Sequence, residues 1–149
     1  MEIEPLHDDF GARITGVDLT GTLTSDLVEA LHAAIDEYSV LLFAEQNMTD
    51  DAQMRLTRAL GEPEENHVTF GRTGEIVHLG TVGNVVDAET KRDETDPRTQ
   101  YSKGNNLWHS DSSFRLVPSY ISNLHAYEVP DEGGATELVS QRSAYERLD

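Results

Sequence analysis

The residue types best suited to chemistry lie together in the segment Trp108-His109-Ser110-Asp111. In an extended strand, side chains two positions apart point to the same face, so His109 and Asp111 would present an imidazole and a carboxylate side by side. Such a pair is two thirds of a 2-His-1-carboxylate site, which holds Fe(II) and leaves positions open for oxygen and a cosubstrate. A pair of solvated surface side chains has the same spacing, so the rest of the chain must decide between the two interpretations.

Two helices and a strand are predicted upstream of this pair. Apolar residues at helical spacing predict a helix over residues 27–38, with Thr24 as its N-cap. The apolar run 40–43 predicts a short buried strand. Asp50 and Gln53 resemble a capping box that begins a second helix, which ends before Gly61.

Most of the remaining predicted elements are short strands. The sequence predicts one or two short strands with turns over residues 13–19 and a strand pair over residues 75–86, broken near Gly80 or Gly83. Single strands are predicted over residues 107–114, 119–129 and 135–139, and a last helix begins near Ser140. Residues 87–102 are almost all polar and predict a mobile loop. The chain stops at Asp149 inside the last predicted helix, which indicates a piece of a longer protein.

Composition excludes several classes of partner and site. The chain has 149 residues, the usual length of one domain, with 28 acidic and 11 basic residues and a net charge of −17, which argues against nucleic acid or an anionic membrane surface as partner. The absence of cysteine excludes disulfides, iron–sulfur clusters and thiolate zinc sites. The longest apolar run, residues 40–44, is far shorter than the ~20 residues of a membrane span. With an acidic N-terminus that lacks a signal-peptide pattern, the sequence predicts a cytoplasmic protein.

Several segments resemble one enzyme family. Residues 106–114 resemble the iron-binding strand of the Fe(II)/2-oxoglutarate-dependent dioxygenases of the taurine and 2,4-dichlorophenoxyacetate type, and look most similar to the 2,4-dichlorophenoxyacetate branch. Residues 129–137 resemble the family's Pro-x-x-Gly-Gly-x-Thr segment. Residues 14–19 resemble its opening Gly-Val-Asp-Leu strand, and residues 40–46 resemble a following strand that ends in glutamine. These matches occur in order along nearly the whole chain, which is more specific than any single motif.

The resemblance implies a fold and a set of ligands. The fold would be α+β and mainly β, a double-stranded β-helix or jelly roll with flanking helices, of which residues 1–149 would form the N-terminal part. His109 and Asp111 would bind Fe(II), and Thr136, otherwise an ordinary strand threonine, would hydrogen-bond a carboxylate of 2-oxoglutarate. In the family, the second histidine ligand and the arginine that binds the far carboxylate lie beyond the length of this chain. Relatives commonly form dimers or tetramers, so a homo-oligomer is possible.

The resemblance also implies a reaction, with O2 as second cosubstrate. A small anionic molecule, such as an aryloxyalkanoate or a sulfonate, would be hydroxylated while 2-oxoglutarate is decarboxylated to succinate. His67 lies near the position of a substrate-anion ligand in taurine-type members, and Asn84 lies where it would line the substrate or cosubstrate pocket; a surface histidine and a strand-end turn are the plain alternatives. Two other classes remain open, a truncated or degenerate binding module without catalysis and a two-histidine cupin-like binder.

Overall fold

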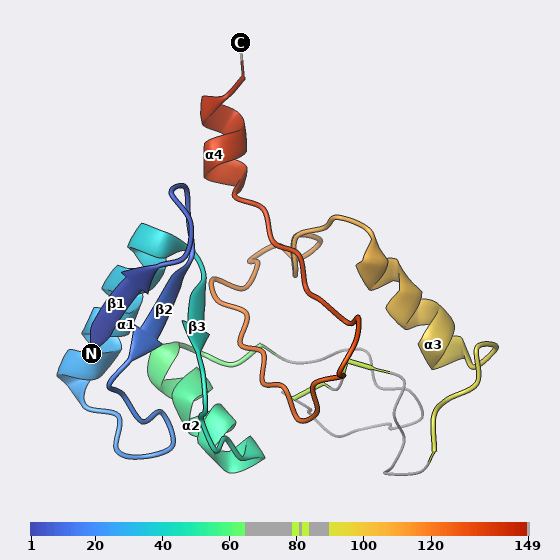
Figure 1. Cartoon of the computed structure of the whole chain (residues 1–149), viewed down its shortest axis with the longest axis horizontal. Coiled ribbons are helices and arrows are strands. Elements are labelled where there is room, and N and C mark those ends of the chain that lie inside the picture. Colours follow the sequence, from blue (N-terminus) through green and yellow to red (C-terminus); the bar gives the residue numbers. More distant parts are fainter. Residues whose placement is uncertain (65–78, 81, 84–89, 149) are drawn as a thin grey trace. The chain divides into compact units, whose positions relative to one another are not determined.

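The computed structural model describes residues 1–64, 79–80, 82–83 and 90–148 (Figure 1). By their internal contacts the residues form two compact units, Met1–Glu62 with Asn123–Asp149, and Pro63–Ser122. His67 and Asn84, and most of the strand pair predicted over residues 75–86 (all except 79–80 and 82–83), lie outside the described residues.

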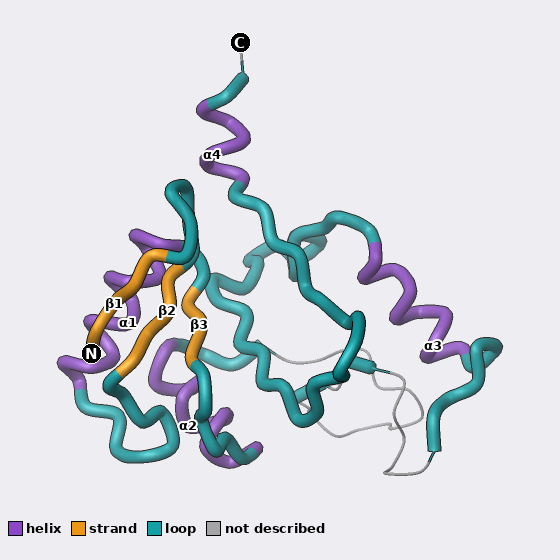
Figure 2. The backbone as a smooth tube through the Cα atoms, viewed as in Figure 1, coloured by secondary structure: helices purple, strands orange, loops and turns teal. Residues whose placement is uncertain are grey.

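The first unit is built on a three-stranded sheet in the order β1-β2-β3 (Figure 2). Strand β1 (Glu2–Pro5) pairs with β2 (Ala12–Thr15) in antiparallel fashion, and β2 pairs with β3 (Leu41–Phe43) in parallel. Parallel neighbours cannot be joined by a tight hairpin, and here helix α1 (Ser25–Tyr38) makes the crossover between β2 and β3. The unit therefore contains one βαβ arrangement preceded by an edge strand.

The first helix forms as its sequence pattern predicts. Thr24 is its N-cap, and the Thr24 side chain accepts a hydrogen bond of 3.3 Å from the Leu27 N–H. Leu31 and Ala34, on the apolar face, are buried. The helix ends at Ser39, whose φ of 62° turns the chain out of the helix and toward β3.

The second helix, α2 (Asp50–Leu60), begins differently from the prediction. Thr49, and not Asp50, is the N-cap, because its backbone is extended and its side chain accepts from the Ala52 N–H at 3.2 Å. Gln53 does not complete a capping box. It is buried, and its amide nitrogen donates to the Asn123 carbonyl at 3.2 Å. The predicted stop is confirmed, since Gly61 follows the last helical residue.

Leucines from three different segments form the core of the first unit. Leu19, Leu31 and Leu56 are buried against one another. Partly buried apolar side chains surround them: Val17, Leu23, Leu27, Leu41, Phe43, Met48 and Leu60. The prediction of a strand here is confirmed but the prediction that it is buried is wrong, because Leu41 and Phe43 are only partly buried and Leu42 is 45% exposed.

A single glutamine joins the two upstream segments that carry the family resemblance. The Gln46 side-chain oxygen accepts from the Leu19 N–H at 2.9 Å. Its amide nitrogen lies 3.2 Å from the Val17 carbonyl and 3.3 Å from the Ala44 carbonyl. Because the backbone groups beside a buried leucine need partners, Gln46 supplies hydrogen bonds that no neighbouring strand provides there.

The strand predicted over residues 13–19 is confirmed only in part, and β1 was not predicted. Strand β2 ends at Thr15, where Gly16 takes a left-handed φ of 71°. All four residues of β1 are exposed, so the hydrophobic alternation by which a strand is recognised is weak.

The strands predicted over residues 107–114, 119–129 and 135–139 do not form, and these segments are irregular. A strand is stable only when a neighbour pairs with its N–H and C=O groups. Among the described residues the only sheet is that of β1 to β3, and none of these segments belongs to it; they expose large apolar side chains, with Leu116 fully exposed. The expectation of a mainly β chain is therefore not met in the described part.

Short helices occupy the rest of the described chain. Helix α3 (Pro97–Ser102) and the 3-10 turn η1 (Lys103–Asn106) follow one another in the second unit. Helix α3 corrects the prediction of an irregular loop for the last part of residues 87–102, whereas the mobility of that segment stays a prediction. The last helix is confirmed as α4 (Gln141–Glu146), with Ser140 as its N-cap.

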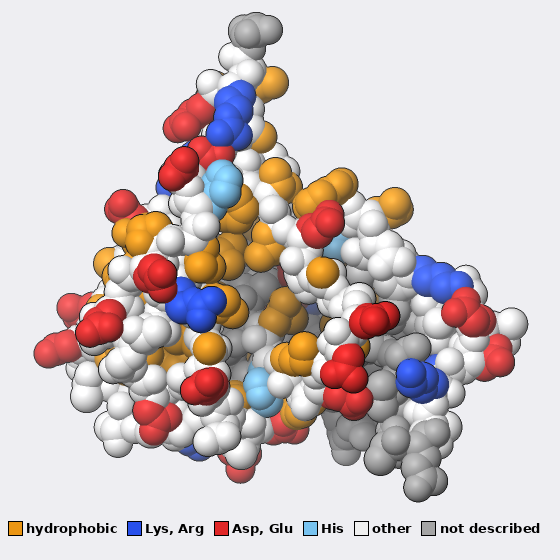
Figure 3. Space-filling model, in the orientation of Figure 1, with side chains coloured by type: hydrophobic (Ala, Val, Ile, Leu, Met, Phe, Trp, Pro, Cys, Tyr) orange, Lys and Arg blue, Asp and Glu red, His pale blue; other side chains and the backbone are white. Residues whose placement is uncertain are grey.

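Acidic side chains are widespread on the face shown in Figure 3, in keeping with the net charge of −17. None of the helices within the described ranges combines the length and the apolar character needed to cross a bilayer.

Candidate metal centre

The His109 and Asp111 side chains lie side by side, as their spacing predicts. His109 Nε2 is 3.3 Å from Asp111 Oδ1. The expected strand is replaced by a turn, in which Ser112 takes a left-handed φ of 55° and the Arg115 N–H donates to the Ser112 carbonyl at 3.0 Å. The two side chains therefore lie close without a strand, in irregular backbone that a turn follows directly.

A backbone carbonyl determines which nitrogen of His109 faces Asp111. His109 Nδ1 is 2.7 Å from the Leu107 carbonyl oxygen, which only accepts hydrogen bonds, so Nδ1 carries the hydrogen. In the neutral ring Nε2 then presents a lone pair toward the Asp111 carboxylate. Two electron-rich atoms at 3.3 Å attract a cation between them, either a proton or a metal ion.

The distance between these two atoms fits adjacent ligands of one metal ion. Ligands bound at ~2.1 Å and at right angles would lie about 3.0 Å apart, close to the observed 3.3 Å. The His109 and Asp111 side chains are 46% and 58% exposed, so solvent, a metal ion and further ligands can reach them. Within the described ranges no group of three or more histidine, cysteine, aspartate or glutamate residues could hold a metal, so the pair offers two candidate ligands.

A serine orients the Asp111 carboxylate. Ser122 Oγ donates to Asp111 Oδ2 at 2.9 Å, and this contact leaves Oδ1 directed at His109. His109 and Asp111 are thus each held by a hydrogen bond on the side that faces away from the other residue, His109 by the Leu107 carbonyl and Asp111 by Ser122. Such an arrangement is typical of metal ligands.

Sequence reasoning missed one contributor to this region, Glu64. Its carboxylate accepts from Ser112 Oγ at 2.8 Å and lies 2.6 Å from Arg115 Nε. Glu64 and Ser112 are 48 positions apart and carry no spacing signal, so only the three-dimensional structure identifies the contact.

Thr136, the predicted 2-oxoglutarate ligand, is exposed and belongs to the other unit. The turn that precedes it is as predicted. Gly133 and Gly134 have left-handed φ angles of 74° and 66°, and a Cβ on Gly134 would lie 2.8 Å from Pro130 Cγ. The two glycines are therefore needed for this turn, since other residues rarely adopt such angles.

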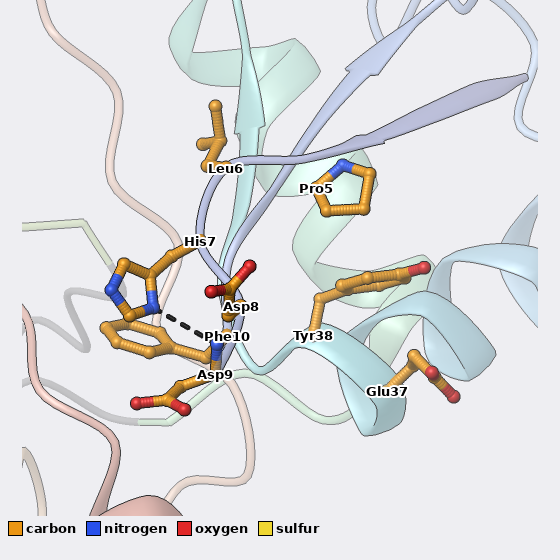
Figure 4. Close-up of a pocket in the computed structure, with 8 residues that line it drawn as sticks. All are labelled: Pro5, Leu6, His7, Asp8, Asp9, Phe10, Glu37 and Tyr38. Carbon is orange, nitrogen blue, oxygen red and sulfur yellow. Dashed lines mark hydrogen bonds between the residues drawn. The ribbon is translucent and has the colours of Figure 1, made fainter.

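The first unit also contains a hollow of about 460 Å³, lined by residues 5–10 with Glu37 and Tyr38 (Figure 4). His7 lies in it, and His7 Nδ1 accepts from the Asp9 N–H at 3.1 Å. Of the predicted site residues that the structure describes, His109, Asp111 and Thr136, none lines this hollow, and its carboxylates point in different directions (Figure 4).

The sequence profile of the family described as "Taurine catabolism dioxygenase TauD, TfdA family" matches residues 2–149, and the chain belongs to this family. The family assignment agrees with the ordered motifs and with the adjacent imidazole and carboxylate.

Among curated relatives, the chain is 34% identical to the alpha-ketoglutarate-dependent 2,4-dichlorophenoxyacetate dioxygenase of Cupriavidus pinatubonensis, over 97% of this chain and 51% of that protein. It is 32% identical to the (S)-phenoxypropionate/alpha-ketoglutarate-dioxygenase of Sphingobium herbicidovorans, over 100% of this chain and 48% of that protein. The chain thus spans about half the length of these relatives.

A similar solved structure is that of AAD-2 in complex with Mn(II) and N-oxalylglycine. The likeness has a TM-score of 0.68 and 30% sequence identity, and covers 79% of this chain and 40% of that one. The described chain therefore shares its fold with part of a protein crystallised with a divalent metal and a 2-oxoglutarate analogue.

Proposed function

We propose that residues 1–149 form the N-terminal part of a single Fe(II)- and 2-oxoglutarate-dependent dioxygenase domain with a jelly-roll core. The observation that carries this proposal is the pairing of His109 Nε2 with Asp111 Oδ1 at 3.3 Å, in a chain of the TauD, TfdA family. Bound Fe(II) would supply the activation of O2. One oxygen atom would enter a substrate C–H bond as a hydroxyl group, and the other would enter succinate as 2-oxoglutarate loses CO2.

In this proposal each described side chain has a separate task. His109 Nε2 offers a neutral lone pair because the Leu107 carbonyl holds the hydrogen on Nδ1. Asp111 Oδ1 offers negative charge, which offsets part of the charge of Fe(II). Thr136 would donate its hydroxyl to a carboxylate of 2-oxoglutarate. His67 and Asn84 are proposed for the substrate pocket on the resemblance alone.

The substrate class follows from the relatives. Two of them are named for phenoxy acids, so the proposed substrate is a small organic anion of the aryloxyalkanoate type, with a sulfonate as the second choice. Hydroxylation of the carbon next to an ether oxygen gives a hemiacetal, which collapses and cleaves the ether.

The metal assignment is tested by anaerobic titration with Fe(II) and 2-oxoglutarate, followed by the weak visible charge-transfer band of the chelate. We expect the band with the wild-type chain and its loss in His109→Ala and Asp111→Asn. His7→Ala and Asp131→Asn, exposed residues of the other unit, are the matched controls and should leave the band unchanged. Thr136→Ala should weaken 2-oxoglutarate binding without affecting binding of the metal alone.

Absence of the band in the wild-type chain would overturn catalysis by this chain and favour the binding-module alternative. The single-domain proposal has its own test, the mass of the polypeptide that carries these residues in cells. A mass of about twice the 16.6 kDa of this chain is expected, given the share of the relatives that it spans.

A further inference from the structure

The Glu64 carboxylate is the centre of a hydrogen-bond cluster beside the candidate metal ligands. Its Oε2 accepts from Ser112 Oγ at 2.8 Å and from Ser119 Oγ, and its Oε1 lies 2.6 Å from Arg115 Nε. The Glu64 and Arg115 side chains are only 32% and 20% exposed, so this pair is less screened by solvent than a surface salt bridge. All three partners of Glu64 belong to the segment that directly follows Asp111.

Ser112 needs such an anchor because of its backbone. Its φ of 55° is left-handed, a conformation in which the Cβ of an L-residue crowds the backbone and which is costly for residues other than glycine. A residue persists in that region only when its surroundings hold it there, and such residues concentrate at functional sites. The Glu64–Ser112 hydrogen bond, together with the Arg115 N–H bond to the Ser112 carbonyl, supplies that restraint.

The restrained turn determines where Asp111 points. Ser112 is bonded directly to Asp111, so a change in its φ would swing the following chain, including Ser122, whose hydroxyl is 2.9 Å from Asp111 Oδ2. Glu64 itself is poorly placed as a metal ligand, since donors already occupy both of its oxygens.

From this geometry we infer that Glu64 is a positioning residue for the metal site: it fixes the left-handed Ser112 turn and thereby directs Asp111 Oδ1 toward His109. The inference rests on the proposed function. It predicts that the carboxylate of Glu64 matters for metal affinity although it does not touch the metal.

The first test measures the anchor without any metal. Release of Arg115 from Glu64 should expose the Arg115–Leu116 peptide bond to trypsin, because Leu116 is already fully exposed whereas Arg115 is held. We expect Glu64→Ala to be cut there about tenfold faster, as for the loss of one charge-assisted hydrogen bond. Cleavage after Arg98, whose side chain is 51% exposed, is the internal standard, and the exposed neighbour Glu62→Gln is the control variant.

The second test measures binding of Mn(II) alone, from the loss of the electron paramagnetic resonance signal of the free ion. Glu64→Ala should weaken binding about tenfold, the lower end of what groups supporting a metal ligand contribute. Adding Ser112→Gly to Glu64→Ala should restore most of the affinity, because glycine adopts the left-handed φ without an anchor. A general loss of structure would not be rescued by a glycine, which separates positioning from mere stability.

The outcomes distinguish the positioning role of Glu64 from the proposed metal site itself. Wild-type affinity in Glu64→Ala, unchanged tryptic cleavage, or a failure of Ser112→Gly to rescue would overturn the role of Glu64 while the metal site stands. A wild-type chain that binds Mn(II) no better than Asp111→Asn would overturn the proposed function, and the positioning role with it.

Discussion

Gln46 offers the sharpest test of how the first unit is held together. Replacing it with leucine keeps a similar volume and removes both polar ends of the side chain. The Leu19 N–H then loses its acceptor at 2.9 Å, and the Val17 and Ala44 carbonyls lose a donor. Leu19 is only 3% exposed, so water replaces the lost acceptor poorly.

The expected cost follows from those three contacts. An unpaired buried N–H costs about 1–3 kcal/mol, and each lost hydrogen bond about 0.5–1.5 kcal/mol. Because the carbonyls recover part of their bonding from solvent, we expect Gln46→Leu to lower the free energy of unfolding by about 2–4 kcal/mol. That is a large part of the ~5–15 kcal/mol that stabilises a typical domain.

Urea denaturation followed by far-ultraviolet circular dichroism measures this change, with the free energy extrapolated linearly to water. Gln141→Leu, an exposed amide at the start of α4, is the matched control and should change the free energy by less than about 0.5 kcal/mol. Gln46→Glu is a second variant for the same test. Its ionised carboxylate still accepts from the Leu19 N–H, but places an oxygen, which cannot donate, beside the Val17 and Ala44 carbonyls. A Gln46→Leu chain as stable as the control would refute the reasoning.

Three further predictions follow from local contacts. Gly133→Ala and Gly134→Ala should each lower the free energy of unfolding by about 1–2 kcal/mol, because alanine is strained in a left-handed backbone. Gly134→Ala should lower it more, because its Cβ would lie 2.8 Å from a ring carbon of Pro130. Equal losses for the two variants in urea denaturation would contradict this. The hydrogen bond from Tyr127 to the Asp50 carboxylate raises the pKa of Tyr127 above 10.0, so its stabilising contribution is complete below pH 10.0 and is lost as pH rises through the higher folded value; a phenolate absorbance titration should lose a phase above pH 10.0 in Tyr127→Phe. Ser122→Ala should weaken Mn(II) binding about tenfold by freeing the ligand carboxylate, and unchanged affinity would remove Ser122 from the site.

The helices were predictable because their signals are local. Thr24 and Leu31 lie within one helix and its cap, so periodicity and capping rules apply directly. Even there the choice between Thr49 and Asp50 as a cap depended on backbone angles that neighbouring residues impose. The strands were less predictable, because their stability depends on partners distant in sequence, and residues 119–129 stay irregular despite their strand-forming composition.

The candidate site was also predictable only where its signals are local in sequence. The closeness of His109 and Asp111 followed from a spacing of two residues, although the backbone there is irregular and not a strand. The contribution of Glu64 depends on a contact across 48 positions, which no local pattern encodes. Physical reasoning from sequence therefore finds candidate ligands that are neighbours in the chain and misses the distant groups that contact the same segment.

The apolar side chains that residues 107–148 present to water have a consequence for how the chain behaves in concentrated solution. Exposed apolar surface favours association between copies, while a net charge of −17 opposes it. The reach of that repulsion shrinks from ~30 Å in dilute buffer to ~8 Å at physiological ionic strength, whereas the apolar attraction is not screened. At a fixed protein concentration, self-association of this chain should therefore increase as salt is added.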